Sequence, residues 1–561
     1  MASNAIYDHE KNEKLQGTVE ASADSTSSPG EDVGVGEIET SGSDHLHRKL
    51  RGREVQLFAL GAAIGTSLFV QMGSVLPKSG PAGLFIGFVW YGTVMLAVNE
   101  CFAEMVCYLP IPSPFVQLGG KWVDEALSFA MGWNYFLNMA LLVPYEIVAL
   151  NLLLNYWTDK VPVEVVIIVV IVLYSLLNLI SVRYFGIAEF YFSIFKVLLI
   201  LGCIFFTFIT MVGGNPLHDV YGFRYWNKPG AFVEHLAPGN TGRFLAIVSS
   251  MVQASFTICG PEYISMVASE TKRPRKILPR AFRSFMWRML FFFIIGSLCI
   301  GIVIPYNDPT LAKVLDGTKS STAAASPYVI AMDRLKISGL PHVVNALIMT
   351  SVFSSGNGLL FSAARALYGM SIQKKAPAFF SRCTKAGVPY FSVIGALLFC
   401  LLAFLQVSNS SASVLTWLVY LITACQLLNY QMAVGITYLH FHRAMKVQGV
   451  DRSSLPYIGK LQPYAAYYAT GGVVVMMLVL GYDLFITGGW SLLYFFLDYT
   501  MLAAFPLAFI GWKLVKRTKY VRPEVADLTL GTTKKEIDVY EELYVPPLRS
   551  KPASWFNRLF E

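Results

Sequence analysis

Long runs of apolar residues restrict the fold of this chain more than any other feature. Residues 165–180 and 197–212 are two of them, and similar runs recur along most of the sequence. A helix of about 20 apolar residues crosses the ~30 Å hydrocarbon core of a bilayer. Because lipid offers the backbone no hydrogen bonds, a spanning segment must satisfy its own polar groups, as a helix does. The runs therefore predict an all-α integral membrane protein with several crossings of the lipid bilayer.

The low share of charged residues supports lipid as the main solvent. Charged residues make up 14% of the 561 positions, whereas soluble globular domains carry roughly 25%. The N-terminal stretch differs, because it is rich in Ser, Glu, Asp and Gly and has no long apolar run. Segments of this kind cannot bury enough surface to fold. We expect a disordered cytoplasmic tail at 1–47, a transmembrane domain at 48–520 and a cytoplasmic C-terminal tail at 521–561.

Proline, glycine and charged residues divide the apolar runs into about twelve predicted spans. Their ranges are 54–75, 81–108, 126–156, 162–182, 187–212, 241–268, 281–305, 341–371, 390–408, 412–440, 465–486 and 490–514.

Clusters of lysine and arginine mark alternate loops between the predicted spans. They lie at 45–53, 271–283, 374–385, 443–460 and 513–522. Basic short loops are retained on the cytoplasmic side of a membrane, so this pattern predicts that both termini are cytoplasmic. The same loops could bind nucleic acid or lipid headgroups, but their alternation with apolar spans favours topology, and we expect no nucleic-acid partner. One opposite loop contains the sequon Asn409-Ser410-Ser411, which could carry a glycan.

The sequence predicts no metal, cofactor or catalytic site. Most of the eight cysteines lie inside apolar runs, no C-x-x-C pair occurs, and the eight histidines show no ligand spacing. Such cysteines behave as small apolar residues rather than as zinc ligands. A nucleophile–base arrangement and a cofactor loop are also missing from the sequence, so we do not expect an enzyme.

Two predicted spans contain glycine and other helix breakers where an uninterrupted span would carry leucine or valine. The first span has Gly61 and Gly65, and the sixth has Gly260-Pro261-Glu262. A broken helix leaves backbone groups unpaired in lipid unless it lines a protein cavity. Two breaks five helices apart are typical of transporters built from inverted repeats. Gly61 and Gly65 could instead only permit close helix packing.

The breaks and the buried charges indicate what such a cavity could bind. Half-helix ends present N–H groups to a carboxylate and C=O groups to an ammonium, as a zwitterionic amino acid requires. An ionisable side chain within a span costs ~2.5 kcal/mol or more unless it faces protein or water. The ionisable residues in the predicted spans are Glu100, Glu104, Glu146, Glu189, Lys196 and Glu262. Glu104 and Glu189 lie near predicted cytoplasmic ends, where gating or packing is the expected role. The deeper Glu146, Lys196 and Glu262 could serve substrate or proton handling, or a structural pair.

At these residues the sequence resembles the amino acid-polyamine-organocation superfamily and, within it, the fungal amino acid permeases. The resemblance extends over most of 48–520 and rests on linked motifs in order: Gly65-Thr66, Gly132-Trp133-Asn134-Tyr135, Val182-Arg183-Tyr184-Phe185-Gly186, Phe256 through Glu262 to Arg280, Ser354-Ser355-Gly356-Asn357, and Arg365-Ala366-Leu367-Tyr368. It implies a LeuT-like fold of two inverted five-helix repeats plus two helices, with helices 1 and 6 broken. It also implies proton-coupled uptake at the plasma membrane.

The resemblance further implies which residues meet the substrate and the proton. Backbone near the substrate carboxylate would come from Ala63, Ile64, Gly65, Thr66 and Ser67, and backbone near its amino group from Phe256, Thr257, Ile258, Cys259 and Gly260. The same cavity would be faced by Glu146, Ser354, Asn357, Thr423 and Gln426, while Lys196, Glu262 and Glu104 would serve proton coupling or gating. In related proton-coupled members a lysine at the position of Lys196 takes the place of a sodium ion; a permanently charged brace to first-helix carbonyls is the alternative.

The subgroup that the sequence resembles most is the dicarboxylic amino acid permeases. This rests on Pro144-Tyr145-Glu146, on residues 157–162 and on the outer segment 214–226. It implies aspartate and glutamate as substrates, although no arginine lies at membrane depth in the predicted site helices.

Other substrates and another function stay open. A neutral or basic amino acid, choline or a polyamine could be carried, since Glu146 and Glu262 could receive a cation. A sensor that binds an amino acid without transporting it is a second alternative. Lys11 and Lys14, among acidic residues of the tail, could be ubiquitin acceptors that bring ubiquitin-ligase adaptors to the protein, or only solvated charges.

Overall fold

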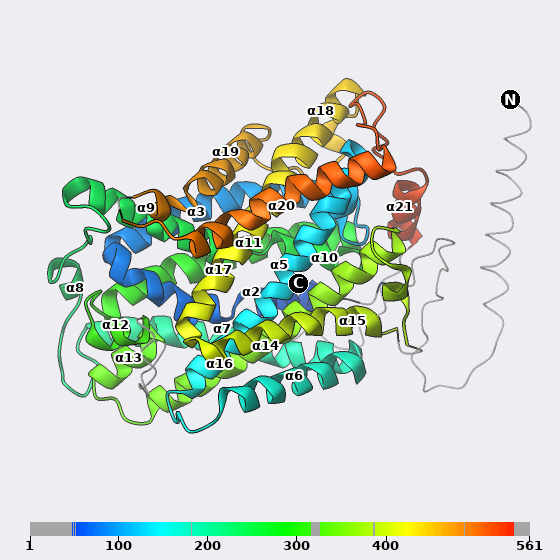
Figure 1. The fold of residues 1–561 in the computed structure, drawn as a ribbon. Helices are drawn as coiled ribbons and strands as arrows, with labels where there is room; N and C mark the ends of the chain where they lie inside the picture. Colours follow the sequence, from blue (N-terminus) through cyan, green and yellow to red (C-terminus); the bar gives the residue numbers. More distant parts are fainter. Residues whose placement is uncertain are drawn as a thin grey trace, which may run out of the picture. The chain divides into compact units, whose positions relative to one another are not determined.

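The computed structural model describes residues 48–543, apart from 49, 51, 181, 316–325, 385, 386 and 487. The predicted tail at 1–47, with Lys11 and Lys14, lies outside the described residues, as does 544–561. The described part is helical, and its β-structure is limited to one isolated bridge between Leu50 and Thr271. Figure 1 shows long helices running side by side with short helices at their ends.

Among the described residues, nine helical segments are long and apolar enough to cross a membrane: Ser67–Tyr108, Glu125–Leu154, Tyr191–Met211, Gly239–Glu270, Pro274–Val303, Leu340–Ile372, Tyr390–Ser408, Ser411–Val447 and Leu492–Lys516. Two shorter apolar helices, Val163–Leu179 and Tyr464–Val479, lie at further predicted spans. The prediction of an all-α membrane protein is confirmed. The count of twelve crossings stays a prediction, because the segment Ser67–Tyr108 includes the end of the first predicted span as well as the second, and two other predicted spans correspond only to the shorter helices.

The first predicted span is broken where the sequence indicated. Helix α2 (Gly52–Ala63) ends before Ile64 and Gly65, and the chain resumes as the π-helix η1 (Ser67–Gln71) and then α3 (Met72–Tyr108). Inside α3 the backbone turns sharply at Gly80, whose φ of 70° is accessible mainly to glycine. This turn separates the first predicted span from the second.

The sixth predicted span is broken in the same way. Helix α9 (Gly239–Thr257) ends at Ile258, and α10 (Pro261–Met266) begins after Gly260, whose φ is 148°. Proline at the first position of α10 costs no hydrogen bond, because that N–H would have no intrahelical partner. The predicted breaks in helices 1 and 6 are therefore present.

Helix α5 (Glu125–Leu154) lies at the centre of the bundle, where it packs against α14 (Leu340–Ile372) and α17 (Ser411–Tyr430). Most of its residues are buried inside the protein, whereas α20 (Leu492–Lys516) is mostly exposed along its length. The remaining long helices are α6 (Val163–Ile180), α7 (Val182–Met211), α11 (Pro274–Val303), α15 (Tyr390–Leu397) continued by η5 (Leu398–Phe404) and α16 (Leu405–Ser408), and α19 (Tyr464–Val479).

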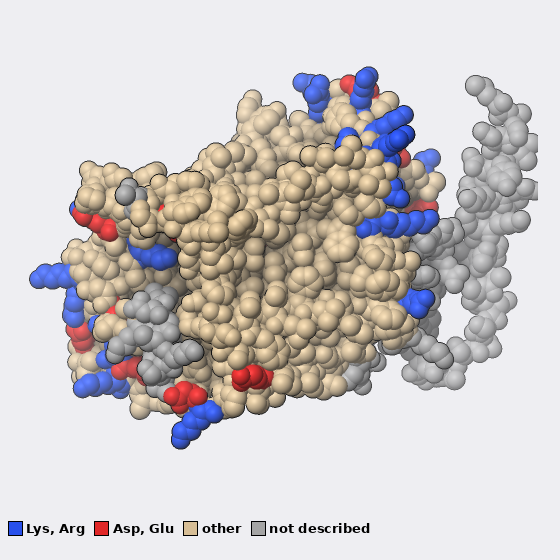
Figure 2. Space-filling model, viewed as in Figure 1, with Lys and Arg blue, Asp and Glu red and all other residues tan. Residues whose placement is uncertain are grey.

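The two ends of the helix bundle are distinguished by short helices. Helices α8 (Arg224–Asn227), α12 (Pro309–Leu315) and α13 (Pro327–Arg334) lie at one end, called here the α8 end. Helices α18 (Leu439–Val447) and α21 (Thr533–Leu543) lie at the other, the α21 end (Figure 1). Figure 2 shows charged side chains at both ends and a broad band between them that carries almost none. Such a band suits the hydrocarbon core of a membrane.

The described part of the predicted C-terminal tail packs on the bundle. The Val521 N–H donates to the Val123 carbonyl at 2.8 Å, and Trp122 Nε1 donates to the Asp527 carbonyl at 3.1 Å. Ile537 of α21 is 3% exposed. Residues 521–543 therefore form part of the structured α21 end.

Candidate functional site

Glu146 of α5 reaches the break in the first helix. Its Oε2 accepts hydrogen bonds from the Thr66 hydroxyl at 2.5 Å and from the Thr66 N–H at 3.4 Å. The side chain is buried, and Ser355 of α14 also bonds it. Gly65 lets the carboxylate come this close, because a Cβ there would lie 2.5 Å from Glu146 Oε1. The N–H groups freed by the break thus meet a carboxylate that the protein itself supplies.

Lys196 of α7 reaches the carbonyl end of the same break. Its Nζ donates to the Gly61 carbonyl at 2.5 Å and lies 3.8 Å from Glu189 Oε1. Both side chains are buried, and either charge would be costly alone. The positive charge of Lys196 and the negative charge of Glu189 therefore stabilise each other. Ser354 donates to Glu189 Oε2 at 2.9 Å, which ties α14 to this pair. A cation therefore stands at the carbonyls that the end of α2 leaves unpaired.

Further contacts of α14 complete this first network. Ser351 donates to the Ile64 carbonyl at 3.3 Å, within the break itself. Asn357 accepts from Asn178 of α6 at 2.7 Å. One face of α14 therefore carries polar side chains toward the break from Ser351 to Ser355, while the Asn357 amide oxygen is already bound by α6.

Glu262 occupies the break in the sixth helix. Its Oε2 accepts from the Gly260 N–H at 3.2 Å, and Tyr430 of α17 donates to both carboxylate oxygens at 2.9 and 3.0 Å. Gln426 donates to the same Tyr430 hydroxyl at 3.3 Å. A carboxylate at a helix N-terminus is favoured by the helix dipole. Among the described ion pairs none includes Glu262.

Aromatic residues separate the two networks. The rings of Tyr145, next to Glu146, and Phe256, at the end of α9, meet edge to face at 5.3 Å. The buried hydroxyls of Tyr91, Tyr135 and Tyr145 have no hydrogen-bond partner among the described residues. Buried polar atoms are normally paired, so these hydroxyls leave bonding capacity for a polar solute between the breaks.

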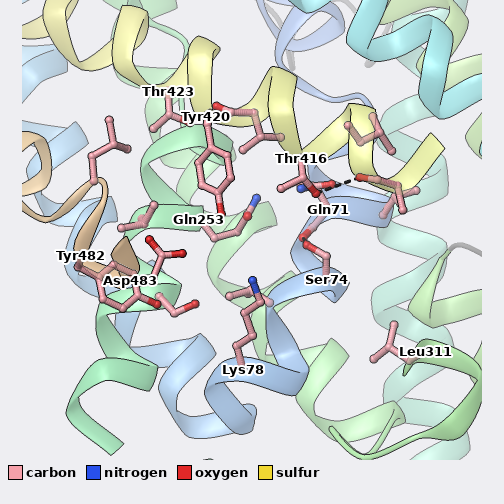
Figure 3. Close-up of a pocket in the computed structure, with 18 of the residues that line it drawn as sticks. Gln71, Ser74, Lys78, Gln253, Leu311, Thr416, Tyr420, Thr423, Tyr482 and Asp483 are labelled. Carbon is pink, nitrogen blue, oxygen red and sulfur yellow. Dashed lines mark hydrogen bonds between the residues drawn. The ribbon is translucent and has the colours of Figure 1, made fainter. Parts of the chain in front are cut away.

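A cavity of about 310 Å³ opens on the α8-end side of the breaks. Its walls include Gln71 of η1, Gln253 of α9 and Thr423 of α17, so both broken helices contribute. Gln253 also donates to Thr257 at 3.2 Å, which links the cavity to the second break. Figure 3 shows Lys78 and Asp483 pointing into the cavity from different walls. The volume suits a small organic solute.

An uncharged histidine contacts one of the cavity-lining residues. His235 Nε2 and the Tyr482 hydroxyl are 3.1 Å apart, and Tyr482 lines the cavity. Burial, and secondly the positive charge of Lys78, lower the pKa of His235 to about 4. His235 therefore stays neutral in water at moderately acid pH.

The predicted site residues fall into distinct groups. The first network contains residues 64–66, Glu146, Lys196 and Ser354. The second network contains Gly260, Glu262 and Gln426. Thr423 lines the cavity. Ala63, Ser67, Phe256, Ile258 and Cys259 flank the breaks.

Glu104 lies apart from both networks, at the α21 end of α3. Tyr438 donates to its Oε2 at 2.5 Å, the Gly459 N–H donates to its Oε1 at 2.7 Å, and Arg452 forms an ion pair with it. Arg452 and Gly459 belong to the loop between α18 and α19, and Tyr438 directly precedes α18. The structure thus places Glu104 where it can brace or gate the α21 end, away from a substrate at the breaks.

Three ionisable residues were missed by the sequence reasoning: Lys78 and Asp483, which line the cavity, and Asp498, which is buried in α20. Asp498 lies inside the predicted span 490–514. Like Glu146, it is an ionisable residue within an apolar run, so the same argument marks it as a candidate. Lys78 and Asp483 sit near the ends of predicted spans, where a charge is unremarkable in the sequence. Only the packing shows that they point into a cavity.

Comparison with known proteins identifies related chains. A model of the amino acid permease family matches residues 54–523. A general amino acid permease of Saccharomyces cerevisiae is 41% identical over 498 residues, which cover 87% of this chain and 83% of that protein. A proline-specific permease of Emericella nidulans is 36% identical over 515 residues, 91% of this chain and 92% of that protein. A dicarboxylic amino acid permease of Saccharomyces cerevisiae is 34% identical over 501 residues, 89% of this chain and 81% of that protein.

A solved structure shares the fold. The crystal structure of a manganese transporter from Eremococcus coleocola superposes with a TM-score of 0.50 at 12% identity, covering 83% of this chain and 94% of that one. At this identity the likeness concerns the fold alone. It confirms the predicted LeuT-like architecture.

Proposed function

The chain belongs to the amino acid permease family, and on this premise we propose that it is a proton-coupled symporter that imports amino acids across the plasma membrane. It is a multi-pass permease and not an enzyme. The observation that carries the proposal is the gathering of Glu146, Lys196 and Glu262 at two helix breaks within membrane-spanning helices. Ionisable groups at such a depth are costly and are retained where a solute or proton passes.

The two breaks divide the recognition of an α-amino acid between them. The backbone of Ala63 to Ser67 would bind the substrate carboxylate, in competition with Glu146 for the Thr66 N–H. The backbone of Phe256 to Gly260 would bind the ammonium, close to the carboxylate of Glu262. Protonation of Glu146 would free the Thr66 N–H for the substrate, which couples a proton to substrate binding.

Acidic amino acids are the substrates that the resemblance to dicarboxylic permeases predicts. Lys78, which points into the cavity, supports this specificity because it could attract a second carboxylate (Figure 3). Neutral and basic amino acids or other amines are the second candidate. It is supported by the acidic groups Glu146, Glu262 and Asp483 and by the variety of relatives, which are named as general, proline-specific and lysine-specific permeases.

Both termini are proposed to be cytoplasmic, with the α21 end inside and the α8 end outside. The basic segment 513–522 supports this orientation, since it leads from α20 to α21. The tails 1–47 and 521–561 would then lie on the cytoplasmic side, and Lys11 and Lys14 would be the residues for ubiquitin attachment.

Uptake of radiolabelled aspartate by cells that lack their own permeases tests the function. Uptake is expected to be stronger at acidic than at neutral outside pH. Unlabelled glutamate, arginine, leucine and proline serve as competitors. Inhibition by glutamate alone supports the acidic specificity, and inhibition by leucine or arginine supports the second candidate. Binding of an amino acid without any uptake would contradict transport and favour a sensor.

A further inference from the structure

Asp498 is a buried carboxyl in α20 that takes no part in the networks at the helix breaks. It is 1% exposed, and neither carboxylate oxygen has a hydrogen-bond partner among the described residues. Helix α20 begins at Leu492, so at 1.5 Å per residue Asp498 lies roughly 9 Å along it. A charged, unpaired carboxylate inside a membrane helix is energetically costly. Such a group must either carry a proton or hold another cation.

No described lysine or arginine has an electrostatic interaction with Asp498. The one charged group that interacts with it electrostatically is Asp483, in η8 (Tyr482–Phe485), at the start of the link to α20. The other titratable groups that interact with it are tyrosines: Tyr420 of α17 and Tyr499 of α20 itself. The rings of Tyr420 and Tyr494 meet edge to face at 5.6 Å. No titratable group of α5, which also packs against α20, acts on Asp498.

Asp483 connects this buried carboxyl to water. Asp483 and Tyr420 both line the cavity at the α8 end, and Figure 3 shows them pointing into it. Lys78, on another wall, acts on Asp483, but no ion pair between the two is among those of the described residues. His235 is hydrogen-bonded to Tyr482, the residue before Asp483 in the chain. The Asp483 carboxyl therefore lines the cavity, whereas the Asp498 carboxyl is buried in the protein.

We propose that Asp498 is a proton-binding site of this transporter that exchanges its proton with the cavity on the side of Asp483, separately from the networks at the helix breaks. The inference rests on the proposed proton-coupled uptake. A hydronium ion in the cavity gives its proton to the Asp498 carboxylate and leaves as water, and release reverses the step. Two neighbouring carboxylates resist being ionised together, which favours a proton on one of them. Among the described residues no group of three or more His, Cys, Asp and Glu could hold a metal ion.

Proteoliposomes containing an Asp498→Asn variant test the coupling. Asparagine keeps the shape of the side chain but cannot take up the proton. Amino-acid-driven proton uptake is expected to be lost, while exchange of labelled for unlabelled amino acid is kept. Asp219→Asn is the matched control, because Asp219 is exposed at the α8 end and paired with Arg224. A variant with unchanged proton uptake overturns the proposal. Stimulation by NaCl at constant pH in the wild type but not in Asp498→Asn also overturns it, since the site would then bind sodium.

Infrared spectroscopy of the purified proteins gives a readout that does not depend on transport. A carbonyl-stretch component of a protonated carboxylic acid is expected at neutral pH in the wild type and in Asp219→Asn, and this component is expected to be missing from the spectrum of Asp498→Asn. Identical spectra of all three overturn the proposal. If the wild type moves amino acids without protons, the proposed coupling fails, and the infrared band still decides whether Asp498 holds a proton.

Asp483→Asn is the second variant, for the case that Asp498→Asn does not reach the membrane. It leaves Asp498 in place and removes the neighbouring charge. The infrared band is expected to disappear over a different pH range from that of the wild type. An unchanged titration overturns the pairing of the two carboxyls.

Discussion

At the scale of single residues, glycine decides how closely an acidic side chain can approach the broken backbone. Gly61 packs directly against Glu189, and Gly65 against Glu146 and Ser355. Close packing and broken helices are therefore not alternatives here. The same glycines that lie at the end of α2 and in the break also leave space for the carboxylates of Glu189 and Glu146.

Gly65→Ala is expected to abolish most uptake while the protein still reaches the membrane. The added Cβ would lie 2.5 Å from Glu146 Oε1 and 2.6 Å from Ser355 Oγ. Overpacking of this kind costs typically ~1–3 kcal/mol, and here it displaces the carboxylate from Thr66. Uptake rate and the thermal melting temperature in detergent are the measurements.

Gly202→Ala is the control for this prediction. Gly202 lies on the exposed face of α7, where a Cβ would meet nothing within 4 Å. Unchanged uptake in Gly202→Ala is expected. Equal behaviour of the two variants would show that the space at Gly65 does not matter for transport.

At the scale of elements, helix α21 binds the first turn of α11, the helix that follows the broken sixth helix. Arg275 pairs with Asp538 at 2.6 Å, and the Arg275 N–H donates to Glu541 at 2.8 Å. The segment just before α11 forms the bridge between Leu50 and Thr271. Ion pairs at a surface contribute only ~0–1 kcal/mol each, so the burial of Ile537 has to supply much of the docking energy.

Ile537→Asp is expected to release α21 from the bundle. Ile537 is 3% exposed, and a carboxylate there would be buried without a partner. Limited digestion with trypsin, which can cut after Lys534 and Lys535 in α21, is expected to become faster. Val539→Asp on the same helix is the control, because Val539 is 50% exposed. Equal digestion rates for both variants would argue against a docked helix.

At the scale of the whole molecule, the distribution of charge decides how the protein lies in the membrane. The band without charged side chains in Figure 2 separates the α8 end from the α21 end. Lys513 and Lys516, with Arg517 just beyond, mark the last turn of α20 at the α21 end. Positive charge at one end of a multi-pass protein keeps that end in the cytoplasm.

Cysteine labelling in intact cells tests this orientation. In a Cys383→Ser background, Val220→Cys at the α8 end is expected to react with a membrane-impermeant maleimide. Leu461→Cys at the α21 end is expected to react only after the membrane is opened. Both positions are exposed, and Cys383 is the exposed cysteine among those described. Labelling of Leu461→Cys in intact cells would reverse the proposed topology.

The sequence by itself determined the class of fold and the places where two helices break. Lipid imposes these features locally, because each span must be long, apolar and internally bonded, and a break needs residues such as Gly260 and Pro261. Glu146, Lys196 and Glu262 could be selected for the same reason, since charge within an apolar run is visible in one dimension.

Only the tertiary structure decided which partners these charged residues contact. Glu146 contacts Thr66 across 80 positions of the chain, whereas Glu104 is bound by Tyr438 and Arg452 at the α21 end. The cavity wall with Lys78 and Asp483 and the unpartnered state of Asp498 also depend on packing between distant helices. The length of an apolar run shows that a segment crosses the membrane. The neighbours of a polar side chain follow instead from how distant helices pack, and no local pattern in the sequence specifies that packing.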